Sequence, residues 1–411
     1  MNIAIFTLGC KTNQYESELI REAFVKSGNV IIEPKDFADL YIINSCVVTN
    51  KAEAETRKLI SEAFNKNPKA KIILTGCFAH LHKNFADKNI LTYTGRKNNI
   101  AEFYYKEKVD PGDINSEKII KFANHTRAVV KIEEGCNNFC TYCIVPFVKG
   151  KEVKSKNEEV IIDEIKQLIS EGYKEIVLTG TEIGKYGEDQ NINLALLIRQ
   201  LKRLRGLERL RISSIHPGHV TDQFIEEIEP PVVPHLHISL QSGDNEILRK
   251  MNRGYTTEEY LNIVEKLRKK DQNFSISTDL MVGFPGETDK AFLNSINIVR
   301  KVQFSKIHIF RFSKRPFTAA FFMKETVSEN LKKIRAQRLK DITDIEKMEF
   351  KKRFLGKHVR VLIEKYADHY YEGFTPYYLK VKLKGNNIKV GEIIDTFIEK
   401  TDPDYLYGYK I

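Results

Sequence analysis

The sequence predicts an α/β protein in three parts, and three observations lead to this prediction. Short apolar runs alternate with helical patterns through residues 1–350, which indicates parallel sheets covered by helices. Three cysteines follow one of these runs with the spacing C-x3-C-x2-C. After residue 357 polar and apolar residues alternate, which is typical of antiparallel strands in a small β-barrel. We therefore expect domains at residues 1–120, 121–350 and 351–411.

The composition indicates a globular protein and argues against a disordered or membrane-spanning one. The chain has 411 residues, of which 42% are hydrophobic and 29% are charged. It has no apolar run of about 18 residues, and its first residues look like a strand rather than a signal peptide. We therefore expect a cytoplasmic protein with no membrane partner, in which the cysteines do not form disulfides.

The chain is basic, with a net charge of +11 and a pI of about 9.1. A basic surface suits a polyanionic partner such as RNA. A solvated, lysine-rich surface without a nucleic acid partner would give the same charge, so the charge alone leaves both interpretations open.

The N-terminal part places three cysteines at the ends of three predicted strands. Cys10, Cys46 and Cys77 each follow an apolar run, in a Gly-Cys or Ser-Cys step. Because the carboxyl ends of parallel strands meet at one edge of a sheet, the three thiols would gather there. Together they could hold an iron–sulfur cluster, although single cysteines also occur as small core residues. The predicted strands are 2–8, 39–44 and 71–75, with helices at 14–27 and 52–65.

The central part repeats a strand–helix unit six times, which indicates an open, partial β/α barrel. Residues that carry chemistry are expected at the C-terminal ends of its strands. His216 and His308 are tempting as bases, but lone histidines near strands are mostly structural, and we assign them no role. The predicted strands are 128–132, 175–179, 208–213, 235–240, 274–281 and 305–310, with helices such as 158–170 and 257–269.

Cys136, Cys140 and Cys143 leave the end of the first strand of this barrel, and their spacing lets three thiolates converge. A cubane cluster has four irons, so three cysteines leave one iron without a protein ligand and open to chemistry. The alternative is a structural zinc site, which would need a fourth cysteine or histidine at a matching spacing. The nearest histidines are His125 and His216, far from the motif in sequence.

The C-x3-C-x2-C motif resembles that of the radical S-adenosylmethionine (SAM) enzymes. The resemblance implies that SAM chelates the open iron of a 4Fe–4S cluster, and that one electron cleaves SAM to a 5′-deoxyadenosyl radical. It also implies that residues at two other strand ends bind SAM, with Gly180 near the amino group of the cofactor. A plain turn between strand and helix would equally explain this glycine. The candidate cofactor-binding residues are Gly180, Glu182, Ser239 and Gln241.

Nearly the whole chain resembles the methylthiotransferases of that superfamily. Motifs around the three N-terminal cysteines, the run Gly283-Phe284-Pro285-Gly286-Glu287-Thr288 and the stretch 373–381 are all similar to the family. The resemblance implies a flavodoxin-like N-terminal domain, a radical SAM partial (β/α)6 barrel and a small C-terminal β-barrel like the RNA-binding TRAM module. It also implies two 4Fe–4S clusters, the auxiliary one held by Cys10, Cys46 and Cys77.

The run Lys11-Thr12-Asn13-Gln14-Tyr15-Glu16-Ser17 looks most like one branch of this family. That branch methylthiolates C2 of N6-threonylcarbamoyladenosine next to the tRNA anticodon. The resemblance implies the tRNA anticodon stem-loop as a partner, an electron donor such as a flavodoxin or ferredoxin, and a monomer. The same chemistry on isopentenyladenosine in tRNA, or on an aspartate of a ribosomal protein, is the near alternative. A non-catalytic iron–sulfur protein that binds RNA is the alternative of another class.

The sequence departs from the family pattern at two places. Lys149, Lys151 and Lys156 stand where the family usually has arginines. If these positions bind phosphate, lysine keeps the charge but loses the bidentate geometry. Phe317 stands where glycine is usual, which leaves the conformation of its loop open.

Overall fold

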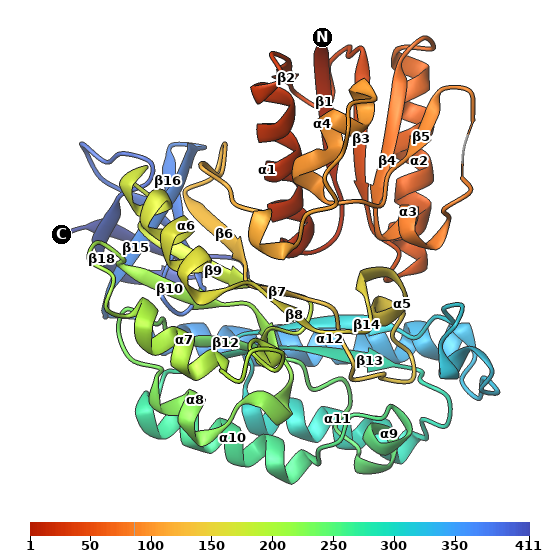
Figure 1. The fold of residues 1–411 in the computed structure, drawn as a ribbon. Helices are drawn as coiled ribbons and strands as arrows, with labels where there is room; N and C mark the ends of the chain where they lie inside the picture. The colour runs from red at the N-terminus through yellow and green to blue at the C-terminus, as the bar shows by residue number, and fades with distance from the viewer. Residues whose placement is uncertain (86) are drawn as a thin grey trace.

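The computed structural model describes residues 1–85 and 87–411, and its three units pack against one another (Figure 1). The N-terminal unit lies over the open central barrel, and the C-terminal β-barrel packs beside the first strands of that barrel (Figure 1). Within the part of the chain that the structure describes, no helix combines the length and the apolar character needed to cross a membrane.

The N-terminal unit is a five-stranded parallel sheet with strand order β2-β1-β3-β4-β5. This is the order of flavodoxin-like folds, in which ligands bind beyond the carboxyl ends of the strands. The central strand is buried along its whole length because helices cover both faces of the sheet. The elements are β1 (Asn2–Thr7), α1 (Lys11–Lys26), β2 (Val30–Ile32), β3 (Leu40–Ser45), α2 (Asn50–Lys66), β4 (Lys71–Gly76), α3 (Cys77–Leu81), β5 (Ile90–Thr92) and α4 (Ile100–Tyr105).

The three central strands and two helices of this unit follow the sequence prediction, but the outer strands β2 and β5 were not predicted. Each outer strand has only three residues. A run of three residues is too short to show the alternation by which a strand is recognised. Both are fixed by pairing with a longer neighbour, which depends on the tertiary fold.

The central unit confirms the six-stranded open barrel. Its strands form two sheets, β10-β9-β6 and β11-β12-β13-β14. The third predicted strand is divided at Ser213 into β10 and β11, one in each sheet, so the two sheets continue into one another. All neighbouring strands pair in parallel. The strands are β6 (Arg127–Lys131), β9 (Glu175–Thr179), β10 (Arg209–Ile212), β11 (Ser214–Ile215), β12 (His235–Ile238), β13 (Ser275–Val282) and β14 (Lys306–Arg311).

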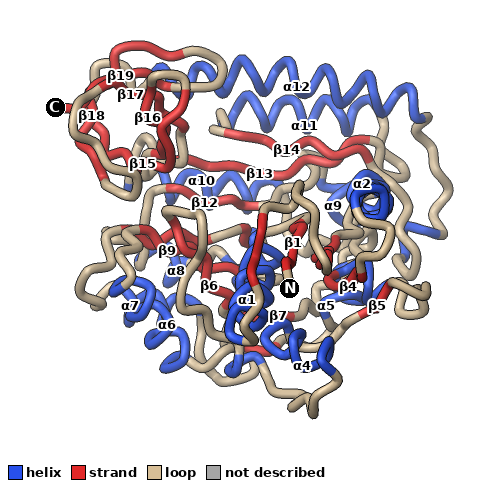
Figure 2. The backbone as a smooth tube through the Cα atoms, turned by 90° about the horizontal axis from the view of Figure 1, so that it is seen from above, coloured by secondary structure: helices blue, strands red, loops and turns tan. Residues whose placement is uncertain are grey.

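Helices cover the outside of this barrel, and its largest hydrophobic cluster fills the space between strands and helices (Figures 1 and 2). The long last helix of the unit runs beside α11 and then enters the C-terminal barrel (Figure 2). It begins at Glu329, because the Ser328 side chain accepts a hydrogen bond from Leu331 N and caps it. The helices are α5 (Val145–Lys149), α6 (Glu158–Ser170), α7 (Leu194–Leu201), α8 (Asp222–Glu226), α9 (Asn245–Lys250), α10 (Thr257–Lys270), α11 (Asp289–Val302) and α12 (Glu329–Lys352).

The C-terminal unit is a closed barrel with strand order β15-β16-β17-β19-β18. Four of its strand pairs are antiparallel, as predicted, but β17 and β19 pair in parallel. β17 begins only at Lys380, because Tyr378 has a φ of +62° and lies in a turn. The strands are β15 (His358–Ala367), β16 (Tyr370–Phe374), β17 (Lys380–Lys384), β18 (Ile393–Thr401) and β19 (Leu406–Lys410).

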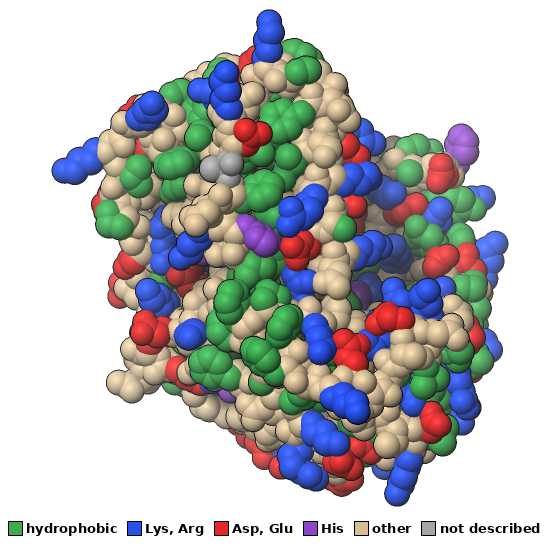
Figure 3. All heavy atoms as spheres, turned by 90° about the vertical axis from the view of Figure 1, so that its right-hand side faces the viewer, with side chains coloured by type: hydrophobic (Ala, Val, Ile, Leu, Met, Phe, Trp, Pro, Cys, Tyr) green, Lys and Arg blue, Asp and Glu red, His purple; other side chains and the backbone are tan. Residues whose placement is uncertain are grey.

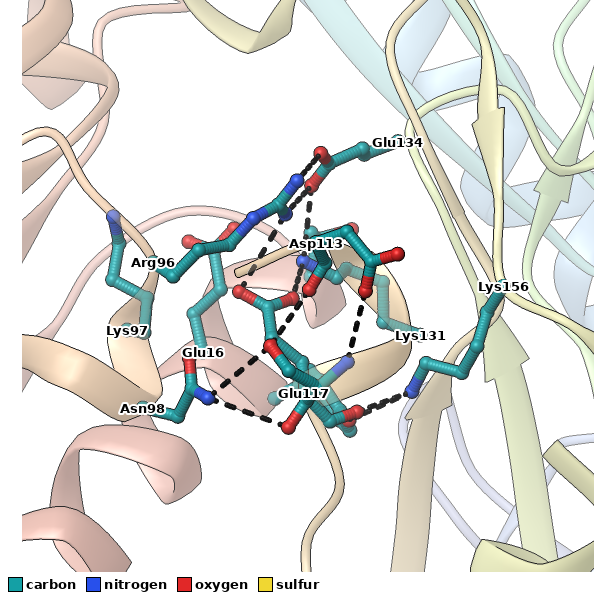
Figure 4. A network of polar contacts seen from close by, with 12 residues as sticks. Glu16, Arg96, Lys97, Asn98, Asp113, Glu117, Lys131, Glu134 and Lys156 are labelled. Atoms are coloured by element: carbon teal, nitrogen blue, oxygen red, sulfur yellow. Dashed lines mark hydrogen bonds and ion pairs between the residues drawn. The ribbon is translucent and has the colours of Figure 1, made fainter. Parts of the chain in front are cut away.

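A buried polar network joins the N-terminal unit to the first strand of the barrel (Figure 4). Lys131 of β6 forms an ion pair with Glu117, and Glu134 lies 3.3 Å from the same ammonium group. Glu134 also contacts Arg96 of the N-terminal unit at 2.7 Å. On the other side of Glu117, Lys156 donates to its main-chain oxygen at 2.6 Å. Because these charges are buried and paired, they fix the N-terminal unit at one angle over the barrel.

Replacing Lys131 by methionine should lower the free energy of unfolding by about 3 kcal/mol, since it removes the nearest cation of the buried Glu117 carboxylate and leaves only Arg96 at 3.7 Å. The Lys131 side chain is only 1% exposed, so water cannot replace the lost partner. Chemical denaturation of the variant measures this loss. Lys166→Met, which removes an exposed lysine from α6, is the matched control. Equal stability of the two variants would contradict the structural role of the network.

Candidate active site

The loop that carries Cys136, Cys140 and Cys143 is closed at its base by two short strands. These are β7 (Glu133–Glu134) and β8 (Lys154–Ser155), which pair with each other. Gly135 has a φ of +90°, and a side chain there would lie 1.8 Å from the Glu152 carbonyl oxygen. Glycine at this position therefore allows the two ends of the loop to pack closely.

The three thiols of this loop share one environment. Burial raises the pKa of Cys136 to about 11 and that of Cys143 to about 12, and the charge of Cys140 adds to both shifts. Arg253 places Nη1 3.3 Å from Cys140 Sγ, which sets a cation beside the group. Cys136 is buried while Cys140 and Cys143 are partly exposed, and three cysteine sulfurs in one short loop are a donor set that fits an iron–sulfur cluster.

Two of the four candidate SAM-binding residues connect directly to this loop. The Glu182 carboxylate lies 3.5 Å from the Asn138 side-chain nitrogen and accepts a hydrogen bond from His216 N at 3.1 Å. Burial raises the pKa of Glu182. Ser239 accepts hydrogen bonds from Arg253, the residue that also contacts Cys140.

The other two candidates have clear backbone roles. A side chain at Gly180 would lie 2.0 Å from a Glu133 carboxylate oxygen, so the glycine makes room for that buried residue. Gln241 has a φ of +70°, and its backbone bonds Asp279 O and Met281 N. Arg253 was missed in the sequence because no spacing marks it, and only the fold brings it to Cys140.

The three N-terminal cysteines lie at one edge of their sheet, after β1, β3 and β4. A side chain at Gly9 would approach Cys46 Sγ to 3.1 Å, so the ends of β1 and β3 lie side by side. Burial raises the pKa of the Cys77 thiol to about 12; Lys149 opposes this shift, while Cys10 and Cys46 add to it. Three mutually interacting thiols at one edge again fit a cluster.

Asn13 holds this edge together. Its side-chain nitrogen donates to Leu8 O at 2.7 Å and to Ser45 O at 3.0 Å, which ties the end of β1 to the end of β3. Its own carbonyl accepts a hydrogen bond from the Asn44 side chain at 2.9 Å. The asparagine therefore positions the segments that carry Cys10 and Cys46.

Lys149 links the two cysteine regions. It lies on α5, just after the central cysteine loop, and its ammonium is 2.7 Å from Glu16 of α1. Burial alone would raise the pKa of Glu16, but Lys149 lowers it to about 2. Burial alone would lower the pKa of Lys149, but Glu16, Cys77 and Cys10 favour its charged form and raise the pKa. A stable cation therefore faces the N-terminal cysteines.

The structure excludes phosphate binding by Lys156, because its side chain is fully buried in an ion pair with Glu164 at 2.8 Å. Lys149 is paired with Glu16 at 2.7 Å, and its side chain is 13% exposed. Phe317 has a φ of +66°, the left-handed conformation that glycine adopts readily, and its side chain is 64% exposed. Its loop thus keeps the conformation suited to the usual glycine.

A cavity of about 800 Å³ lies between the N-terminal cysteines and the strand ends of the barrel. Cys10, Cys46 and Cys77 line one end of it, and the Gly180–Glu182 turn of the barrel lines its middle. Thr12 donates to Gly180 O at 3.2 Å, which brings the N-terminal unit into contact with this turn. In the described ranges 1–85 and 87–411, no three Cys, His, Asp or Glu side chains are arranged to hold a single metal ion.

The far end of the cavity is polar, which the sequence reasoning missed. The Nδ1 atom of His237 lies within hydrogen-bond distance of Ser277 Oγ, at 3.1 Å. Its Nε2 atom lies 3.1 Å from the Asp279 carboxylate. His235 contacts the same Ser277 hydroxyl at 3.1 Å. These residues point inward at every second position of β12 and β13. Polar residues with a period of two on neighbouring strands were the signal for this surface. Lys306 and His308 of β14 also line it.

Two family models match the chain. The model described as the radical SAM superfamily matches residues 130–299, and the one described as uncharacterized protein family UPF0004 matches residues 2–93. The solved structure of the radical S-adenosylmethionine methyltransferase TsrM from Kitasatospora setae, with tryptophan and a SAM analogue, has a TM-score of 0.58. The two sequences are 14% identical, and the alignment covers 78% of this chain and 74% of the TsrM chain. At this identity the similarity shows the fold alone.

Full-length relatives are also found. Threonylcarbamoyladenosine tRNA methylthiotransferase MtaB of Thermotoga maritima is 41% identical, covering 95% of this chain and 92% of its own length. The protein of the same name from Bacillus subtilis is 36% identical, with coverages of 99% and 95%. A tRNA-2-methylthio-N(6)-dimethylallyladenosine synthase of Clostridium novyi is 36% identical, with coverages of 98% and 95%.

Proposed function

Because the chain belongs to the radical SAM methylthiotransferase family, we propose that it methylthiolates C2 of N6-threonylcarbamoyladenosine next to the tRNA anticodon. Its 41% identity to the Thermotoga maritima enzyme exceeds the 36% to the dimethylallyladenosine enzyme, which favours the threonylcarbamoyl substrate. The structural observation that carries the proposal is the shared cavity. A substrate adenine in it can face the N-terminal cysteines and the barrel turn at once.

The cofactors follow from the family. Radical SAM enzymes use SAM and a 4Fe–4S cluster, and Cys136, Cys140 and Cys143 would hold that cluster here. We assign a second 4Fe–4S cluster to the N-terminal thiols, whose placement at one edge of the sheet fits one. When bound, these groups supply the radical that removes hydrogen from C2 and the sulfur that takes its place.

The chain itself positions the reactants. Glu182, held by His216 N and directed at the central cysteine loop, is placed to accept hydrogen bonds from the amino group of SAM. Arg253 orients the loop through Cys140 and Ser239. Lys149, held by its ion pair with Glu16, places a cation in the cavity that the N-terminal cysteines line.

The surface suits an RNA partner. On the C-terminal barrel lysines lie over tyrosine rings, at 4.6 Å for Lys382 over Tyr405 and 5.1 Å for Lys400 over Tyr407. Lys and Arg side chains also intermingle with hydrophobic ones on the face shown in Figure 3. Such surfaces bind phosphates and stack bases. We therefore propose the tRNA anticodon stem-loop as partner, a cytoplasmic monomer, and a flavodoxin or ferredoxin as electron donor.

Mass spectrometry of tRNA nucleosides from cells with and without the gene tests this function. We expect loss of the 2-methylthio derivative of threonylcarbamoyladenosine alone, with the unmodified precursor accumulating in its place. Loss of the isopentenyl derivative instead would keep the chemistry and change the substrate. An unchanged set of tRNA nucleosides would contradict the proposal and direct the search to ribosomal proteins or to a non-catalytic role.

A further inference from the structure

We propose that the polar end of the cavity is a subsite for a carboxylate on the N6 substituent of the substrate, with Lys11 and Lys306 as its anion-binding residues. This inference rests on the proposed function and deepens it, because it explains which adenosine the enzyme accepts. Lys11 begins α1, and Lys306 begins β14 on the opposite wall. Both line the cavity together with His235, His308 and Tyr378.

The pairing of charges in the cavity carries the argument. Of its lysines and arginines, Arg127 is paired with Glu364 at 2.7 Å and Lys149 with Glu16 at 2.7 Å. Within the described residues, Lys11 and Lys306 have no carboxylate within 4.0 Å. Lys11 is half-buried, where a cation without a counterion is costly, whereas Lys306 is an exposed cation that lines the same cavity. An anionic group of the substrate would neutralise them.

The acidic side chains of this end are already engaged, so they do not compete for the two lysines. Glu364 pairs with Arg127, and Asp279 lies 3.1 Å from His237. Glu175, below the Arg127 side chain, is enclosed by Arg211 at 2.7 Å and by Arg209. Lys11 and Lys306 are therefore the two cations of the cavity lining that no carboxylate of the described residues pairs with.

The charges of the two lysines act on the same two histidines. Burial is the main cause of the lowered pKa of His308, and the charges of Lys306 and Lys11 lower it further. The same two lysines also lower the pKa of His235, which burial lowers most. The His235 ring is 4% exposed, and its Nδ1 has no hydrogen-bond partner among the described residues. Its Nε2 faces Ser277, and its ring lies 4.9 Å from Tyr378. His235 and Ser277 therefore add neutral polar groups to the cavity lining beside the two lysines.

A threonylcarbamoyl group offers both features, a carboxylate and neutral N–H, C=O and O–H groups. An isopentenyl group offers neither. Seated here, it would cover two unpaired lysines with hydrocarbon. The subsite thus selects for one substituent and against the other by the same residues.

The test uses anticodon stem-loop RNA carrying N6-threonylcarbamoyladenosine, and the same RNA with the threonine carboxylate replaced by a carboxamide. For Lys306→Met we expect kcat/KM on the acid RNA to fall about 10- to 100-fold, the value of a charged hydrogen bond. Lys11→Met should act in the same direction. The ratio of acid to carboxamide activity should fall with it, and Lys306→Arg should restore part of that ratio.

Direct binding of each RNA, measured by fluorescence anisotropy, should show the same loss of discrimination in Kd. Iron content confirms that the variants are loaded and folded, and Lys301→Met, an exposed lysine of α11, controls for net charge. A Lys306 variant that discriminates like the Lys301 variant would overturn the subsite. A wild-type enzyme that modifies neither RNA would instead overturn the proposed function, so the two failures are distinguishable.

Discussion

Replacing Cys140 by alanine is expected to abolish reductive cleavage of SAM, a loss on the order of 10³-fold or more. The variant keeps only two thiolates of the central loop, and Arg253 loses the sulfur that lies 3.3 Å from it. The loop then lacks one cysteine ligand, and Nη1 of the buried Arg253 lacks its sulfur partner. It can therefore no longer hold an intact iron–sulfur cluster. Anaerobic incubation with SAM and dithionite, followed by quantification of 5′-deoxyadenosine, measures the effect.

Two controls make this result specific. Iron content should fall from about eight toward about four per chain, since the N-terminal thiols are untouched. Thr141→Val changes the neighbouring residue, whose hydroxyl donates to Lys250 O at 2.9 Å on the outside of the loop, and should retain cleavage. SAM cleavage by the Cys140 variant at the wild-type rate would refute the assignment of this loop.

Much of the fold could be predicted because it is encoded in local patterns. The second barrel strand and its preceding helix begin and end where the sequence placed them, at Glu175–Thr179 and Glu158–Ser170. Their apolar residues repeat with periods of two and 3.6, and turn residues bound them. The six cysteines were also visible, because Cys10, Cys46 and Cys77 each follow an apolar run and the other three share the spacing C-x3-C-x2-C.

What could not be predicted depends on contacts between distant residues. Lys156 was read as a candidate phosphate ligand, yet Glu164 and Tyr15 enclose it from two different units. Arg253 reaches Cys140 from 113 positions away. The His235, His237 and Asp279 surface forms only when two strands pair in register. Charge pairing decides whether a lysine is structural or free for a ligand, and a sequence does not show which charges pair.

The same distinction separates the roles of the two cysteine sets, and Cys46→Ala tests it. We expect this variant to lose methylthiolated product by on the order of 10³-fold, because the thiol lies in the N-terminal unit at the end of the cavity. Reductive SAM cleavage should persist, since Cys136, Cys140, Cys143 and Arg253 belong to the barrel. Product is measured by mass spectrometry of digested RNA, and cleavage by 5′-deoxyadenosine from the same reaction.

Thr49→Ala is the matched control for this variant. Thr49 lies in the same loop and caps α2 by accepting a hydrogen bond from Ala52 N at 3.2 Å. Its loss should cost about 1 kcal/mol of stability, yet it leaves all thiolates in place, so product should still form. If Cys46→Ala made normal product, sulfur insertion would not involve this edge of the sheet. If it lost SAM cleavage as well, the N-terminal unit would be needed to assemble the barrel site, and the two cysteine sets would form one functional unit rather than two.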